Sequence, residues 1–173
     1  MKNLILFTTV LFITFSSFSQ EEKKVKLPSV NLKSLDGTVV NSEDIATEGK
    51  VVIINFWATW CKPCIKELIA IGEVYEDWQE EVDFVQYAIS IDDANSSSRV
   101  APFVNSKGWE CKILLDENSE FKRAMNVVNV PHTFVLDKEG NIVWQHAGYA
   151  TGDEESLLEV IKKVNNGEDP SAH

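Results

Sequence analysis

Apolar residues in the central part of the chain follow two kinds of spacing. Near-continuous apolar runs rich in β-branched residues occupy 51–56 and 84–91, a pattern typical of strands that are covered on both faces of a sheet. Between these runs, apolar residues recur at steps of three and four after Cys61, which predicts a helix with one buried face. That face contains Ile65, Leu68, Ile69, Gly72, Tyr75 and Trp78.

Weaker patterns predict further elements on both sides of this strand-helix-strand unit. Apolar residues at 27–35 and 38–40 flank the turn-forming pair Asp36-Gly37 and indicate an N-terminal β-hairpin. The remaining candidates are helices at 99–107, 119–127 and 154–164 and strands at 113–115, 133–136 and 142–144. This succession predicts an α/β fold in which a central mixed β-sheet is flanked by helices on both faces.

The N-terminus has the three-part pattern of a secretory signal. Lys2 supplies a positive charge, residues 4–15 are apolar apart from three threonines, and small residues follow at Ser17 and Ser19. The apolar run is shorter than the roughly 20 residues that a membrane-spanning helix needs. We therefore expect a cleaved signal peptide over 1–19 and a mature protein in the periplasm or otherwise outside the cytoplasm, without stable membrane insertion. An uncleaved N-terminal anchor is the alternative.

The rest of the chain is expected to hold one domain at 27–166, between a flexible lead-in at 20–26 and a polar tail at 167–173. A chain of 173 residues with 44% hydrophobic residues can bury a substantial core. Its 27 Asp and Glu residues outnumber its 16 Lys and Arg residues, and a net charge of -11 excludes nucleic acid as a partner, because phosphates would be repelled. Three cysteines cannot build a disulfide scaffold.

Two of the cysteines stand where the strand at 51–56 gives way to the helix, in Cys61-Lys62-Pro63-Cys64. Unpaired backbone N–H groups and the helix dipole favour an anion here, so they favour a Cys61 thiolate, and Lys62 adds a positive charge. Lowering a thiol pKa from about 8.5 to about 7 corresponds to roughly 2 kcal/mol. Pro63 is tolerated because its missing N–H matters little in the first helical turn. The pattern favours a reactive dithiol.

Two other interpretations of the cysteine pair are weaker. A structural disulfide that closes so short a loop gains only roughly 2 kcal/mol in the chain-entropy model, against about 3 kcal/mol for a loop of about 15 residues. Half of a zinc site would need two further ligands at a matching spacing. The remaining candidate ligands are scattered, at Cys111, His132, His146 and His173.

The segment 56–64, Phe-Trp-Ala-Thr-Trp-Cys-Lys-Pro-Cys, resembles the active-site motif of thioredoxin-fold oxidoreductases and is most similar to their extracytoplasmic TlpA/ResA-like branch. The resemblance extends from about Leu27 to the end of the last helix, and it includes the N-terminal hairpin and an inserted helix-strand segment. It implies a thioredoxin-like fold and a thiol-disulfide oxidoreductase that uses no organic cofactor and no metal. The implied partners are client proteins with disulfides and a membrane thiol electron donor.

The same resemblance implies roles for residues outside the motif. Pro131 is expected to form a cis bond with Val130 and to face the dithiol, where backbone groups can pair with a substrate peptide. A trans proline that opens a strand is the alternative. Glu67 lies three residues after Cys64 and matches a glutamate of this branch. A partly buried carboxylate there would have a raised pKa and exchange protons with Cys64, whereas the alternative is an ordinary solvated glutamate.

Other residues are expected to border the site. The expected substrate-binding rim consists of Trp60, Lys62, Pro63 and Val130. His132 follows the proline and could favour a thiolate if it were protonated near Cys61, but we place it on the rim and outside the catalytic set. Cys111 is expected to pack as an apolar residue, because the resemblance places an apolar residue there.

In the implied reaction, Cys61 attacks a substrate disulfide as a thiolate and Cys64 resolves the mixed disulfide, which leaves the pair oxidised. Net reduction of client proteins, as in cytochrome c maturation, is the preferred direction because Lys62-Pro63 resembles the dipeptide of reducing members. Two other classes stay open on this fold. One is a peroxiredoxin-type peroxide reductase, which would use a lone cysteine, and the other is a redox-inert binding module.

Overall fold

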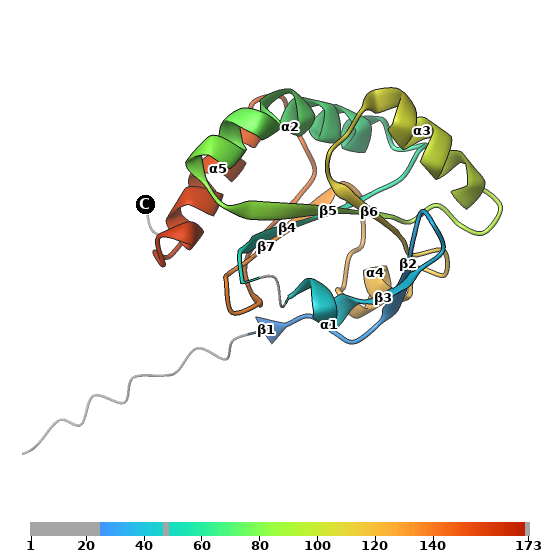
Figure 1. Ribbon diagram of the computed structural model, residues 1–173, viewed down its shortest axis with the longest axis horizontal. Helices are drawn as coiled ribbons and strands as arrows, with labels where there is room; N and C mark the ends of the chain where they lie inside the picture. The colour runs from blue at the N-terminus through green and yellow to red at the C-terminus, as the bar shows by residue number, and fades with distance from the viewer. Residues whose placement is uncertain (1–24, 47–48, 172–173) are drawn as a thin grey trace, which may run out of the picture.

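The strands of the computed structural model, which describes residues 25–46 and 49–171, form one eight-stranded sheet (Figure 1). Their order across the sheet is β1-β8-β7-β4-β5-β6-β2-β3. The strands are β1 (Val25–Lys26), β2 (Asn31–Ser34), β3 (Val39–Asn41), β4 (Val51–Trp57), β5 (Phe84–Ser90), β6 (Lys112–Leu115), β7 (His132–Leu136) and β8 (Asn141–Ala147). The signal peptide expected over residues 1–19 lies outside the described residues.

The centre of the sheet is formed by the two long apolar runs of the sequence. β4 runs parallel to β5, from the pair Val51 and Phe84 to the pair Trp57 and Ser90, and β5 runs parallel to β6. On its other side, β4 pairs antiparallel with β7. Every residue of β4 is buried, because the strand is covered on both faces. The mixed sheet predicted from the apolar pattern is therefore confirmed.

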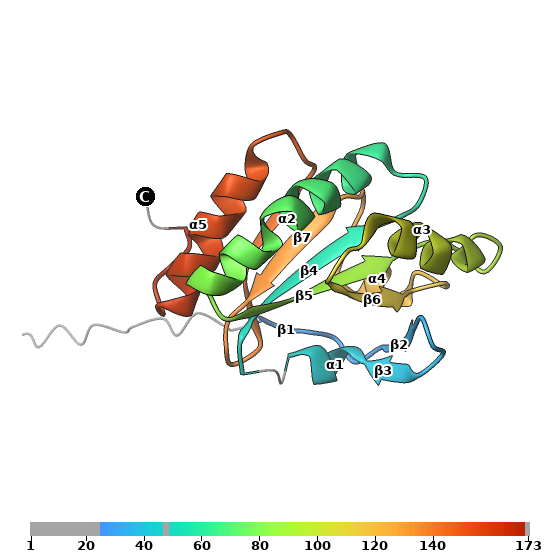
Figure 2. The same cartoon turned by 45° about the horizontal axis from the view of Figure 1, so that its top comes forward.

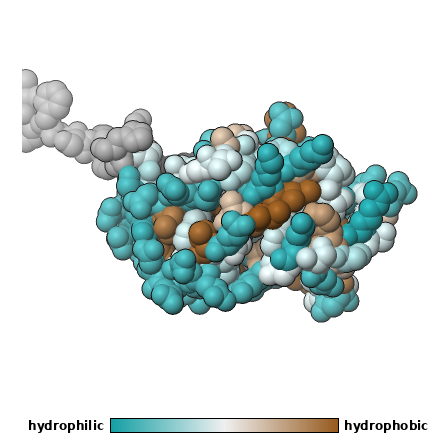
Figure 3. Space-filling view, turned by 90° about the horizontal axis from the view of Figure 1, so that it is seen from above, coloured by the Kyte–Doolittle hydropathy of each residue, from teal (hydrophilic) through white to brown (hydrophobic). Residues whose placement is uncertain are grey.

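Helices cover both faces of this sheet (Figures 1 and 2). One face carries α2 (Lys62–Glu81), α3 (Val100–Lys107), which follows the 3-10 turn η1 (Ser97–Arg99), and α5 (Asp153–Asn165). The other face carries the short helices α1 (Ser42–Ile45) and α4 (Glu120–Ala124). Seen from the side of the long helices, the surface is mainly hydrophilic, and apolar side chains gather in a narrow central band (Figure 3). None of the helices in the described ranges combines the length and the apolar character needed to cross a membrane.

Each face of the sheet has its own apolar core. On the side of the long helices, Ile71 of α2 and Leu157 of α5 belong to one buried cluster. On the other side, the ring of Phe56 packs on Phe121 at 5.2 Å and on Phe134 at 6.0 Å between ring centroids. Burying a side chain of this size contributes roughly 1.5–3 kcal/mol. Together with a third cluster around the cysteine pair, these two clusters hold β4 and α2 in place, and therefore also the junction between them.

Some elements differ from those that the sequence predicts. The helix expected over 119–127 ends at Ala124, because Asn126 has a left-handed backbone with φ of 56°. The sequence predicts a flexible lead-in at 20–26, whereas its last two residues, Val25 and Lys26, form β1, which pairs antiparallel with β8. The N-terminal hairpin is confirmed as β2 and β3, and β2 also pairs with β6, so the hairpin extends the sheet.

Candidate active site

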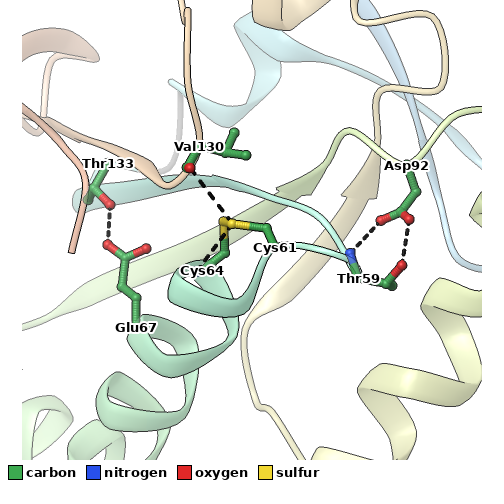
Figure 4. Close-up of a disulfide and its surroundings, with 7 residues drawn as sticks. All are labelled: Thr59, Cys61, Cys64, Glu67, Asp92, Val130 and Thr133. Carbon is green, nitrogen blue, oxygen red and sulfur yellow. Dashed lines mark hydrogen bonds between the residues drawn. A yellow bond between two sulfur atoms is a disulfide. The ribbon is translucent and has the colours of Figure 1, made fainter. Parts of the chain in front are cut away.

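The cysteine pair lies where β4 ends and α2 begins (Figure 4). Cys61 is the N-cap of α2, and its Sγ accepts a hydrogen bond from the backbone N–H of Cys64 at 3.3 Å. Cys61 and Cys64 are joined by a disulfide. Cys61 is 6% exposed and Cys64 is 0% exposed, so Cys61 is the more accessible of the two. A Cys61 thiolate would be stabilised by the same backbone N–H and by the positive end of the helix dipole.

The segment before β7 reaches the disulfide from a distant part of the sequence. The Val130–Pro131 peptide bond is cis, as the resemblance implies. The pairing of His132 with Phe56 brings this segment to the end of β4. The carbonyl oxygen of Val130 then lies 3.7 Å from Cys61 Sγ (Figure 4). A sulfur in a disulfide carries no hydrogen, so this is a contact in the oxidised protein, and a Cys61 thiol can donate to the same oxygen after reduction.

Glu67 is buried on the first turns of α2, at 5% exposure, and its carboxylate points toward β7 (Figure 4). Its Oε1 accepts a hydrogen bond from the Thr133 hydroxyl at 2.6 Å. Thr133 Oγ1 in turn accepts from Asn55 Nδ2 at 2.8 Å, and Asn55 Oδ1 accepts from Gln86 Nε2 at 2.8 Å. This row of buried polar side chains crosses β5, β4 and β7, and each member donates in the direction of Glu67.

The surroundings of Glu67 bring the pKa of its carboxyl close to 7. Burial raises the pKa of this carboxyl from its ordinary 4.5 to about 7, although the hydrogen bond from Thr133 and the nearby Asn55 amide act in the opposite direction. The negative charge of Asp153 adds a smaller upward contribution to the pKa. Glu67 is therefore a buried group that can both accept and donate a proton near pH 7, and the solvated alternative is wrong. Its hydrogen-bond partner in the oxidised protein is Thr133 rather than Cys64.

A second buried carboxylate holds the loop between β4 and the cysteines (Figure 4). Asp92, which is fully buried, accepts from the Thr59 backbone N–H at 2.8 Å and from the Thr59 hydroxyl at 2.6 Å. It also accepts from the Ser90 hydroxyl at 2.9 Å.

Sequence reasoning missed Asp92, Thr133, Asn55 and Gln86. Asn55 carried a usable signal, because it is a polar residue within an apolar run that is covered on both faces.

The expected rim residues lie at or near the surface around the disulfide. Trp60 is 63% exposed, Lys62 and Pro63 are exposed, and Val130 is half-buried. Val128, which sequence reasoning did not single out, is 79% exposed and adds an apolar side chain to the segment before the cis-proline. Large exposed apolar side chains near a reactive group are a feature of surfaces that bind other proteins.

The two residues left outside the catalytic set have other partners. His132 stacks on the ring of Phe134 at 4.5 Å, and its Nε2 lies 3.1 Å from Gln145 Oε1. Burial lowers the pKa of His132, which disfavours the charged ring that could stabilise a thiolate. Cys111 is half-buried against the cluster that contains both active cysteines, in agreement with a packing role. Burial raises the pKa of the Cys111 thiol to about 12.

A mixed sheet with a helix-capping Cys-Lys-Pro-Cys disulfide that faces a cis-proline defines a thioredoxin-like thiol-disulfide oxidoreductase. Comparison with known proteins supports this assignment. Residues 24–145 match the AhpC/TSA family, and the chain belongs to this family. The thiol-disulfide oxidoreductase ResA of Bacillus anthracis is 30% identical over 165 residues, which cover 93% of this chain and 91% of that protein.

Solved structures extend the comparison. A thioredoxin-like protein of Porphyromonas gingivalis is 41% identical with a TM-score of 0.74, and the match covers 87% of this chain and 96% of that one. A structure described as a putative thiol:disulfide interchange protein DsbE from Chlorobium tepidum is 27% identical with a TM-score of 0.67, and the match covers 79% and 92% of the two chains. The chain is accordingly a thiol-disulfide oxidoreductase of the ResA/DsbE type, with Cys61 and Cys64 as its redox pair.

Proposed function

We propose that the protein reduces disulfides in client proteins outside the cytoplasm, with Cys61 as the attacking thiolate and Cys64 as the resolving thiol. The observation that carries this assignment is the difference in exposure, because Cys61 is 6% exposed and Cys64 is 0% exposed. A client sulfur must come within bonding distance of the attacking sulfur, so the exchange starts at Cys61. The N-terminus of α2 supports the same assignment, since it stabilises a thiolate at its cap.

The exchange proceeds in two steps. In the first step, the Cys61 thiolate attacks the client disulfide, a bond forms between Cys61 and one client sulfur, and the other client sulfur leaves as a thiolate that takes up a proton. In the second step, Cys64 gives its proton to the Glu67 carboxylate and attacks the Cys61 sulfur. The second client thiolate leaves and is protonated. Two electrons have passed to the client, and a membrane thiol carrier returns two electrons to the cysteine pair.

The role of Glu67 in this scheme is supported by its position and its pKa. Glu67 lies one helical turn beyond Cys64 on α2. A carboxyl with a pKa of about 7 can accept the Cys64 proton during oxidation and can release it again at physiological pH. The hydrogen bond from Thr133 keeps the carboxylate inside the domain rather than in solvent. Thr133 is therefore a positioning residue in this proposal.

Client binding is assigned to the rim around the disulfide. An extended client segment can lie across Trp60 and Val130 and pair with backbone groups beside the cis-proline, as an added strand would. Lys62 and Pro63 border the same surface. The client class that we favour is one whose cysteines must be reduced before use, such as the Cys-x-x-Cys-His haem attachment sites of cytochromes c. The secretory pattern at 1–19 supports the extracytoplasmic location.

The proposal is tested by catalysed reduction of insulin with dithiothreitol. We expect the protein to accelerate the reaction, Cys61→Ser to abolish the acceleration, and the matched control Cys111→Ala to retain it. Equilibration with glutathione measures the reduction potential of the cysteine pair and so tests the direction of electron transfer. A reductase is expected to have a potential nearer to about -270 mV, the value for thioredoxin, than to about -120 mV, the value for DsbA. A potential near the DsbA value would overturn the reductive direction and leave the exchange chemistry intact.

The peroxiredoxin-type alternative has less support. Such an enzyme needs a lone cysteine that ionises near neutral pH, whereas Cys61 and Cys64 are paired with each other. The third cysteine does not fill that role, because burial raises the pKa of Cys111 to about 12. We expect hydrogen peroxide turnover to be negligible beside insulin reduction. A peroxidase activity that survives Cys64→Ser and is lost in Cys61→Ser would favour the alternative.

A further inference from the structure

The two oxygens of the Glu67 carboxyl have different surroundings. Oε1 accepts the hydrogen bond from Thr133. Oε2 is buried and has no hydrogen-bond partner among the described residues. A buried carboxyl oxygen without a partner is costly, particularly when the group is charged, so its surroundings should contain something that can solvate it.

A small cavity lies beside Glu67, between α2, the end of β8 and the start of α5. Its volume is about 20 Å³. A cavity needs roughly 10–15 Å³ to hold a water molecule, and the water also needs at least two polar partners. The volume meets the first requirement, and the polar side chains of the lining can meet the second; they belong to Glu67, Thr133, His146, Tyr149, Asp153 and Glu154.

The outer wall of the cavity consists of groups that can pass a proton on. The Tyr149 hydroxyl donates to Glu154 Oε2 at 2.7 Å, and this carboxylate also accepts from the Gly152 backbone N–H at 3.0 Å. Asp153 lies next to His146, with Asp153 Oδ2 3.7 Å from His146 Nε2, and both side chains are nearly half exposed to solvent. The cavity therefore has Glu67 on its inner side and half-exposed titratable groups on its outer side.

We propose that this cavity holds one water molecule that hydrogen-bonds to Glu67 Oε2 and carries the Glu67 proton to solvent along Tyr149 and Glu154. The inference rests on the proposed function, in which Glu67 takes a proton from Cys64 in every cycle. That proton has to leave before the next cycle, and the Oε1 side of the carboxyl is closed by Thr133. Tyr149 suits a relay because its hydroxyl can accept a proton from the water while it donates its own to Glu154.

The water itself is tested by nuclear Overhauser contacts between water and protein in the oxidised, full-length protein. We expect long-lived water contacts to the methyl group of Thr133 and the ring protons of Tyr149. Contacts to neither residue would show that the cavity is dry and would overturn the proposal.

The proton route is tested with Tyr149→Phe and Glu154→Gln, and Glu155→Gln is the matched control because Glu155 is an exposed carboxylate next to Glu154. Carboxyl carbon relaxation dispersion near pH 7 measures how fast Glu67 exchanges its proton. We expect about a tenfold slower exchange in the two route variants, the factor that corresponds to losing one hydrogen bond, and no change in the control. Wild-type exchange rates in both route variants would refute the route.

Activity measurements separate this inference from the proposed function. If Glu67→Gln leaves the pH profile of insulin reduction unchanged, the catalytic role of Glu67 fails, whatever the water does. If Glu67→Gln alters the profile while Tyr149→Phe and Glu154→Gln leave proton exchange at the wild-type rate, the role of Glu67 stands and the water route fails.

Discussion

Replacing Glu67 by Gln should stabilise the protein at alkaline pH. The substitution keeps the size of the side chain and an oxygen that can accept from Thr133, but it removes a buried charge. In the folded protein the pKa of Glu67 is about 7, whereas its ordinary value is 4.5. Between these two pH values the folded protein holds a proton that the unfolded chain has released, so stability falls as the pH rises through this window.

The size of the effect follows from the pKa shift. One pKa unit corresponds to about 1.4 kcal/mol, so raising the pKa from 4.5 to about 7 lowers the free energy of unfolding by about 3 kcal/mol above pH 7. Below about pH 4.5 the carboxyl is protonated in both states, and this loss disappears. We therefore expect Glu67→Gln to match the wild type near pH 4.5 and to exceed its stability by up to about 3 kcal/mol at pH 8.

Urea unfolding of the oxidised proteins between pH 4.5 and 8 measures this difference, because the disulfide keeps both active cysteines from titrating. The control is Glu73→Gln, an exposed position on the same helix, where the change should stay within about 0.5 kcal/mol at every pH. The reasoning is refuted if the stability difference between Glu67→Gln and the wild type does not grow with pH, or if the variant is less stable at pH 8.

Three further predictions concern neighbouring groups. Thr133→Val removes the donor to Glu67 and should raise the pKa of that carboxyl by roughly 1–2 units above about 7, as seen in a carboxyl carbon NMR titration; an unchanged pKa would contradict the hydrogen bond. In the reduced native protein, alkylation followed by mass spectrometry should show one fast thiol, Cys61, and two slow ones, because Cys64 is fully buried and Cys111 is half-buried with a raised pKa; rapid labelling of all three thiols would contradict this burial. Trp60→Ala should raise the KM for insulin severalfold while dithiothreitol reduces the Cys61–Cys64 disulfide at the wild-type rate; an unchanged KM would remove Trp60 from the client surface.

The sequence predicts the parts of the fold that depend on local patterns. The buried run that became β4 and the apolar face of α2 have clear periodicities, and the junction between them identifies Cys61 as a helix cap. The predicted helix over 119–127 was too long, because periodicity does not report the left-handed backbone of Asn126. The sequence pattern does not indicate β1, because a strand of two residues is too short to show an alternation of apolar and polar positions. Its pairing with β8 is a long-range contact.

The candidate site likewise contains residues that the sequence predicts and residues that it does not. Cys61 and Cys64 follow from the motif and from the physics of a helix N-terminus, whereas the resemblance was needed for the cis Val130–Pro131 bond and for Glu67. The polar row that ends on Glu67 joins residues on three strands, so no local pattern indicates it. Its pairing depends on which residues of β4 and β7 lie opposite each other, as Asn55 and Thr133 do.

In the proposed reaction, Cys61 attacks a client disulfide and Cys64 resolves the mixed disulfide. The most direct measurement is the mass of the reduced Cys64→Ser and Cys61→Ser variants after exposure to a peptide disulfide. We expect a stable mixed disulfide on Cys61 in Cys64→Ser, because the resolving thiol is missing. We expect no comparable adduct on Cys64 in Cys61→Ser, because Cys64 is fully buried. Equal trapping on Cys64, or no adduct on Cys61, would show that Cys61 is not the attacking thiol.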